Sequence, residues 1–245
     1  MNGRAIERPC GAGSEDGGIR RRGDTARRAG RVAGSRIPGD IQLSRRVLAL
    51  GDSYTIGESV DPSQRWPNQL ADLLRDCGIA VDDPEIIART GWTTDELSRA
   101  IDQAKPAGPY ALVTLLIGVN NQYRGRDAEE YRTEFAALLE RAIGFAGRTP
   151  QRVIVLSIPD WGVTPFARKR NRASIAKAID RFNAINREES QRAGVHYVDV
   201  TPGSRAAALD PALIAGDGLH PSGRMYAEWA RLALPAARSI LETAK

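Results

Sequence analysis

The stretch VLALGDSYTIGE, residues 47–58, places four apolar residues directly before Gly51, Asp52 and Ser53. An unbroken apolar run of this length is typical of a strand that is buried on both faces of a parallel sheet. Ser53 therefore follows the predicted end of a strand. A serine at that point can form a turn, cap a helix or act as a nucleophile, and the other strand ends decide between these roles.

Four further short β-type runs follow, at residues 85–88, 112–117, 153–158 and 195–200. Stretches with apolar residues at helical spacing separate them, and Thr93 with Glu96 and Asp127 with Glu130 have the spacing of helix-capping boxes. Strand–helix alternation predicts right-handed crossovers, and so a flavodoxin-like three-layer α/β/α sandwich around a five-stranded parallel sheet. The predicted buried helix faces are Trp66, Leu70, Leu73, Leu74 and Cys77; Tyr131, Phe135, Leu138, Leu139 and Ala142; and Met225, Trp229, Leu232, Ala236 and Ile240.

The positive charge of the chain is concentrated at its beginning. Residues 1–46 have a net charge of +6, which leaves −1 for residues 47–245 out of the total of +5. The first segment is rich in Gly, Arg and Ser without apolar periodicity, so we expect a disordered tail over residues 1–45 and one folded domain over residues 46–245. Since the domain is nearly neutral, we expect no nucleic acid partner for it.

Several other functions lack their sequence signals. No run of 18 apolar residues predicts a membrane span, and no apolar stretch follows Arg20–Arg22 as a twin-arginine export signal requires, so we expect a cytoplasmic protein. The sequence has no Walker loop, no Gly-x-Gly-x-x-Gly and no metal-ligand cluster. We therefore expect no cofactor and no metal.

The loops that follow the predicted strands contain the residues that acyl-transfer chemistry needs. A serine nucleophile requires a histidine base, and the chain has only His196 and His220. His220 lies in DGLHPS, residues 217–222, three residues after Asp217, on a loop expected at the same sheet edge as Ser53. His196 begins a strand at the opposite edge, so a structural role is expected for it.

Acyl transfer also needs hydrogen-bond donors where the carbonyl oxygen becomes negative. The backbone N–H of Ser53, the backbone N–H of Gly91 and the side-chain amide of Asn120 are the candidate donors, again from separate strand ends. Each residue alone has a purely structural explanation, but five of them at consecutive strand ends favour a catalytic site.

These blocks resemble the SGNH or GDSL-type hydrolases, through GDSYTIGE, ARTGWTT, GVNN and DGLHPS in this order. The resemblance covers about residues 47–230 and implies a flavodoxin-like sandwich. It implies Ser53 as nucleophile, His220 as base, Asp217 as its orienting acid, and Ser53, Gly91 and Asn120 as the oxyanion hole. Two positions depart from the pattern: Tyr54 stands where the family name has Leu, and Asn121 where an aspartate is usual.

We therefore predict a serine hydrolase that cleaves carboxylic esters with short acyl or acetyl groups, on a small-molecule or carbohydrate substrate. Trp92, Tyr123, Trp161 and Phe166 lie in or beside the strand-end loops and are the predicted substrate-binding residues, and Arg124 and Arg126 are candidates for contact with an acidic substrate. Acyl transfer to another alcohol at the same site, and a non-catalytic carbohydrate-binding module, remain alternatives.

Overall fold

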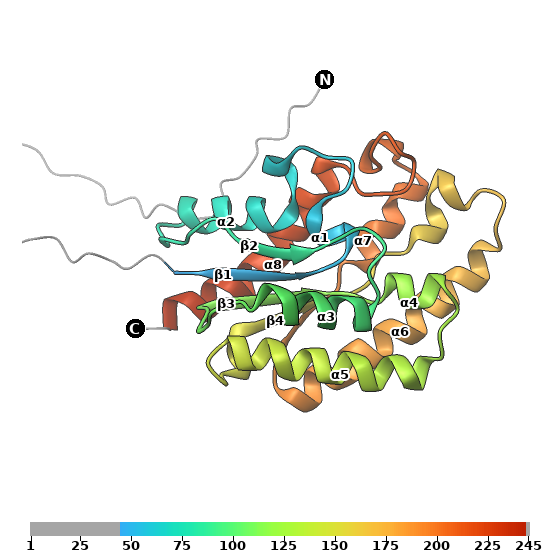
Figure 1. Cartoon of the computed structure of the whole chain (residues 1–245). Helices are drawn as coiled ribbons and strands as arrows, with labels where there is room; N and C mark the ends of the chain where they lie inside the picture. The colour runs from blue at the N-terminus through green and yellow to red at the C-terminus, as the bar shows by residue number, and fades with distance from the viewer. Residues whose placement is uncertain (1–44, 244–245) are drawn as a thin grey trace, which may run out of the picture. The chain divides into compact units, whose positions relative to one another are not determined.

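The predicted strands form one parallel sheet in the order β2-β1-β3-β4-β5 (Figure 1). The structure is a computed structural model that describes residues 45–243, so the predicted tail lies outside the described residues except for Arg45. Arg45 pairs with Val81, and its N–H donates to the carbonyl of Ala80 at 3.2 Å. The strands are β1 (Val47–Gly51), β2 (Glu85–Ala88), β3 (Leu112–Leu116), β4 (Val153–Leu156) and β5 (His196–Val198).

Strands β1, β3 and β4 are completely buried, as their unbroken apolar sequences predict. Strand β5 lies at the edge, is half-buried and is shorter than predicted, with only three residues in the ladder instead of residues 195–200. Strands β3 and β4 also end before the apolar runs do, because the chain leaves the ladder while the following residues remain in the core.

Helices cover both faces of the sheet and give the predicted three layers (Figure 1). Helix α2 packs against α8 on one face, and α5 packs against α3 and α6 on the other. The α-helices are α1 (Ser53–Ile56), α2 (Trp66–Asp76), α3 (Thr94–Ala104), α4 (Val119–Tyr123), α5 (Ala128–Phe145), α6 (Arg172–Ala193), α7 (Thr201–Arg205) and α8 (Gly223–Thr243). Short 3₁₀ turns lie at Pro62–Gln64, Pro150–Arg152, Trp161–Val163, Pro165–Ala167, Ala206–Ala208 and Pro211–Leu213.

The predicted buried faces are right for α5 and partly wrong for α2 and α8. In α8, Leu232 is 48% exposed and Ala236 is half-buried. Because α8 packs against both the sheet and α2, its buried face is wider than one stripe and runs through Tyr226, Ala233 and Ala237 instead. Cys77 is half-buried just beyond the end of α2.

The order of the strands places one crevice at the carboxyl edge of the sheet. The chain passes from β1 outward to β2 on one side and then returns to β3 on the other side of β1. Loops that leave β1 and β3 therefore diverge, and a ligand crevice forms between them at this switch point. No helix within residues 45–243 is long and apolar enough to cross a membrane.

Candidate active site

Ser53 lies where β1 turns directly into the short helix α1. Gly51 ends the strand, and a side chain there would come within 2.5 Å of the carbonyl oxygen of Leu116. Asp52 caps the helix, because its Oδ1 accepts the N–H of Tyr54 at 3.0 Å. This turn holds Ser53, which is only 5% exposed, at the rim of the sheet.

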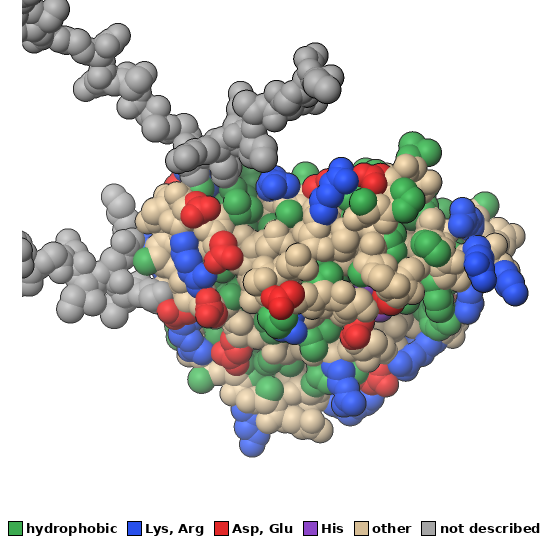
Figure 2. All heavy atoms as spheres, turned by 90° about the horizontal axis from the view of Figure 1, so that it is seen from above, with side chains coloured by type: hydrophobic (Ala, Val, Ile, Leu, Met, Phe, Trp, Pro, Cys, Tyr) green, Lys and Arg blue, Asp and Glu red, His purple; other side chains and the backbone are tan. Residues whose placement is uncertain are grey.

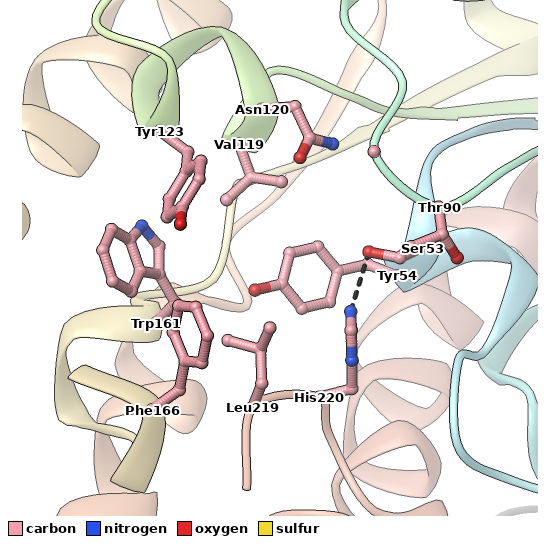
Figure 3. A pocket seen from close by; sticks show the side chains of 11 residues that line it. Ser53, Tyr54, Thr90, Val119, Asn120, Tyr123, Trp161, Phe166, Leu219 and His220 are labelled. Carbon is pink, nitrogen blue, oxygen red and sulfur yellow. Dashed lines mark hydrogen bonds between the residues drawn. The ribbon is translucent and has the colours of Figure 1, made fainter. Parts of the chain in front are cut away.

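Ser53 and His220 are hydrogen-bonded although 167 residues separate them in the chain. The distance from Ser53 Oγ to His220 Nε2 is 2.9 Å (Figure 3). The distance from His220 Nδ1 to Asp217 Oδ2 is 2.5 Å. The three side chains thus form one continuous hydrogen-bonded chain. This is the arrangement in which a carboxylate fixes the tautomer of a histidine that faces a hydroxyl.

Asp217 accepts four hydrogen bonds. Its Oδ1 accepts the backbone N–H groups of Leu219 at 2.9 Å and His220 at 3.0 Å, and its Oδ2 accepts the hydroxyl of Ser59 at 2.9 Å in addition to His220 Nδ1. Burial raises the pKa of Asp217, but these hydrogen bonds, that of the His220 side chain first, outweigh it and lower the pKa to about 2. The carboxylate is therefore ionised at neutral pH.

The oxyanion donors predicted from the sequence converge on the same place. Gly91 has φ = +87°, while a Cβ there would meet only Arg124 Nη2 at 3.9 Å, an ordinary contact, so backbone conformation rather than crowding favours glycine. Asn120 Nδ2 donates one hydrogen to the carbonyl of Trp92 at 2.9 Å, which leaves its second hydrogen for a ligand. As the first residue of α1, Ser53 has a backbone N–H without an intrahelical acceptor.

The two departures from the family pattern both have defined contacts. The ring of Tyr54 packs edge-on against His220, with the ring centroids 5.6 Å apart. The buried amide of Asn121 accepts the N–H of Thr94 at 3.1 Å and donates to Thr94 Oγ1 at 2.6 Å. Thr94 in turn donates to Glu134, so an amide at position 121, next to Asn120 in the chain, completes a partly buried hydrogen-bond network.

A cavity of about 210 Å³ opens beside Ser53 and His220. Tyr123, Trp161 and Phe166 lie together on the side opposite these two residues (Figure 3), and Trp161 Nε1 donates to Gln122. The residues that line the cavity are Ser53, Tyr54, Thr90, Gly91, Val119, Asn120, Tyr123, Trp161, Phe166, Leu219 and His220.

Three of the predicted candidates lie elsewhere. Trp92 is half-buried against the core and does not line the cavity, since its contribution is the carbonyl that Asn120 binds. Arg124 donates to the carbonyl of Gly91 at 2.6 Å and pairs with Glu96, and Arg126 pairs with Asp95 and Glu134. Both arginines thus have acidic partners within the protein.

His196 begins β5, and because the strands are parallel, it lies at the opposite edge of the sheet from the cavity.

Four residues of the site were not predicted from the sequence: Ser59, Thr90, Val119 and Leu219. Val119 and Leu219 directly precede the predicted residues Asn120 and His220. The motifs GVNN and DGLHPS could therefore have indicated that these two residues lie at the site. Ser59 had no signal, because its link to Asp217 joins positions 158 residues apart.

Fold and site together define an α/β/α sandwich with a serine–histidine–aspartate chain at the switch point of its sheet. The sequence matches the model of the GDSL-like lipase/acylhydrolase family over residues 49–228, and the chain belongs to this family. Family membership supports a hydrolase that acts on esters.

Solved structures share the fold at low sequence identity. A structure named TesA has a TM-score of 0.62 and 18% identity, over 80% of this chain and 100% of that chain. A lipase/acylhydrolase from Enterococcus faecalis has a TM-score of 0.61 and 18% identity, over 82% and 99%. A mutant acetyl-xylooligosaccharide esterase from Geobacillus Stearmophilus has a TM-score of 0.58 and 18% identity, over 79% and 94%. Comparison of the sequence with curated proteins gives no significant match.

Proposed function

We propose that the protein hydrolyses carboxylic esters through an acyl-enzyme on Ser53. The observation that most supports this proposal is the hydrogen-bonded chain from Asp217 through His220 to Ser53, which ends at a cavity large enough for a small ligand. A hydroxyl becomes an effective nucleophile at neutral pH when a base that is held in one tautomer accepts its proton.

The reaction has two halves. Ser53 Oγ attacks the ester carbonyl while His220 Nε2 takes its proton, and the same proton then passes to the alcohol as the ester C–O bond breaks. Water, deprotonated by His220, attacks the acyl-enzyme, and the proton returns to Ser53 as the acid leaves. Asp217, ionised at neutral pH, balances the positive charge of the imidazolium in both halves.

We propose that three groups donate hydrogen bonds to the negative oxygen of each tetrahedral intermediate. These are the backbone N–H groups of Ser53 and Gly91 and the side-chain amide of Asn120. Such donors act strongly because they are already oriented and partly removed from water, and the loss of one costs ~10²–10³ in rate. The hydrogen bond from Asn120 to Trp92 and the left-handed backbone at Gly91 support this preorganisation.

The acyl group is assigned to the apolar side of the cavity, beside Val119, Tyr123, Trp161, Phe166 and Leu219. The volume of about 210 Å³ is below the roughly 300–1,000 Å³ of pockets that hold drug-sized ligands. We therefore assign acetyl and other short acyl groups as the preferred acyl groups among uncharged esters.

A panel of 4-nitrophenyl esters with acyl chains of two to twelve carbons tests this proposal. The expected result is a maximum of kcat/KM at two to four carbons, with kcat reduced by at least ~10³ in Ser53→Ala and unchanged in the control variant Ser63→Ala. Full activity of Ser53→Ala would contradict the proposal. Product analysis with added alcohols distinguishes hydrolysis from acyl transfer, since hydrolysis predicts free acid as the main product.

A further inference from the structure

The segment from Trp161 to Ile179 is strongly basic. It contains Arg168, Lys169, Arg170, Arg172 and Lys177 and no Asp or Glu. Residues 47–245 have a net charge of −1, so the segment accounts for +5 and the remaining residues of this range for −6. This stretch of five cations without an acid is called the basic segment here.

Most of these cations have no acidic partner. Arg168, Lys169 and Arg172 are exposed, and within residues 45–243 their side chains form no ion pair and no hydrogen bond. By contrast, Arg205, close to the same segment, pairs with both Asp160 and Asp180. Clustered like charges without counter-charges repel one another, so an arrangement of this kind favours the binding of an anion.

The basic segment adjoins the aromatic wall of the cavity. The Arg170 guanidinium carbon lies 5.1, 5.5 and 5.6 Å from the ring centroids of Tyr123, Trp161 and Phe166, and its Nη2 donates to the Tyr123 hydroxyl at 3.0 Å. Arg170 itself does not line the cavity. It therefore contacts the three rings of the wall without being part of the cavity lining.

Two further contacts fix the position of the segment. The N–H of Phe166 donates to the carbonyl of Gly218 at 3.0 Å, which joins the segment to the loop that holds Asp217 and His220. The segment then enters α6 at Arg172, and the partial positive charge of a helix amino end adds to the field of the side chains. Figure 2 shows Lys and Arg side chains gathered at the right-hand end of the molecule, where the loop between β4 and α6 lies in Figure 1.

We propose that the basic segment selects esters that have a carboxylate or phosphate group several atoms away from the ester carbonyl. This inference rests on the proposed ester hydrolysis. With the carbonyl at Ser53 and the body of the substrate along the aromatic wall, an anionic end that extends beyond the rings to Arg170 enters the field of its chain neighbours Arg168, Lys169 and Arg172. A positive field near a cavity increases the rate of association of anionic ligands. Salt weakens this attraction, because at 0.1 M it largely screens exposed charges that are more than about 10 Å apart.

Two pairs of substrates test the proposal, one for each half of the ester. The 4-nitrophenyl half-ester of adipic acid is compared with 4-nitrophenyl hexanoate, and 4-acetoxybenzoate is compared with its methyl ester. The quantity measured is kcat/KM for the anionic ester divided by kcat/KM for the neutral ester. Intrinsic reactivity of the esters cancels when this ratio is compared between protein variants.

The variant R168E/K169E/R172E reverses the charge of the segment and leaves Arg170 on the rings. Its matched control is K105E/R148E/R231E, which changes the net charge equally at exposed positions outside the basic segment. The expected result is a fall of the ratio by ~10-fold or more for at least one pair in the first variant and no change in the control. Raising NaCl from 20 to 500 mM should lower the ratio in the wild-type protein and not in the first variant.

Equal ratios in the two variants, or a wild-type ratio that salt does not affect, would overturn the proposal while the ester hydrolase assignment stands. Hydrolysis of neither member of any pair by the wild-type protein would overturn the proposed function and this inference with it. If the charge reversal abolished binding to phosphatidylglycerol vesicles and left both ratios unchanged, the segment would bind a membrane surface and the proposal would be wrong.

Discussion

The hydroxyl of Ser59 donates to Asp217 Oδ2 at 2.9 Å, the same oxygen that lies 2.5 Å from His220 Nδ1. Ser59 has φ = +65°, a left-handed conformation that is uncommon for serine. Its neighbour Glu58 accepts a hydrogen bond from Thr90, beside Gly91. The segment after α1 thus joins the loop of Ser53 to the loops of Gly91 and of Asp217.

We predict that Ser59→Ala and Ser59→Gly lower kcat by a similar factor, ~3–10, with little change in KM. Both variants remove the hydroxyl that helps to fix Asp217, whereas only glycine relieves the left-handed backbone. Steady-state kinetics and thermal unfolding of both variants provide the test. The control is Ser63→Ala, which removes a hydroxyl that binds Asp61 instead of Asp217. If only the alanine variant had a lower kcat, the cause would be backbone strain instead of the lost hydroxyl, and the prediction would be wrong.

We predict that Asn121→Asp destabilises the protein by ~2–4 kcal/mol. Aspartate cannot donate to Thr94 Oγ1, and it places a second carboxylate beside Glu134, whose Oε2 lies 3.4 Å from Asn121 Nδ2. Urea unfolding measures the loss, which Glu134→Gln in the same chain should partly restore. The exposed helix cap Asn171→Asp is the control and should be nearly neutral. Unchanged stability of Asn121→Asp would contradict the network.

Asp52 predicts a pH-dependent contribution to stability. Its side chain is fully buried, Oδ2 has no hydrogen-bond partner within residues 45–243, and burial raises its pKa from 3.8 to about 7. The folded state therefore holds the proton between pH 4 and 7 while the unfolded state releases it, so this residue lowers the free energy of unfolding as pH rises through this window, by ~1.4 kcal/mol per unit at most.

Asp52→Asn keeps the acceptor for the N–H of Tyr54 and removes the titration. Relative to the wild-type protein, the variant should gain stability from pH 4 to pH 7 in chemical unfolding. Asp61→Asn is the control: hydrogen bonds from Ser63 lower the pKa of the exposed Asp61 below 3.8, so Asp61 is ionised in both states above pH 4 and its variant should show no change relative to the wild-type protein from pH 4 to pH 7. A difference between wild type and Asp52→Asn that does not vary with pH would refute the prediction.

The sheet and the main site residues were predictable because each depends on local sequence. The apolar runs before Gly51 and Gly118 define buried parallel strands, and parallel strands bring their following loops to one edge. Two residues from distant loops, Ser53 and His220, could therefore be expected to lie close together before any coordinates were known.

The parts that were missed depend on tertiary packing. Leu232 fits the helical spacing of α8 but is exposed, because the contact with α2 widens the buried face in another direction. Trp92 lies in a strand-end loop, yet its ring packs against the core and only its carbonyl faces the site. Ser59 acts across 158 residues through one hydroxyl, which no spacing rule detects.

The central claim is that Ser53 forms a covalent bond to the substrate with His220 as its base. Mass spectrometry of the protein after reaction with a fluorophosphonate measures this most directly. We predict one phosphonyl adduct on the peptide that contains Ser53, lost in Ser53→Ala and formed far more slowly in His220→Ala. An adduct at another residue, or undiminished labelling of Ser53→Ala, would contradict the claim.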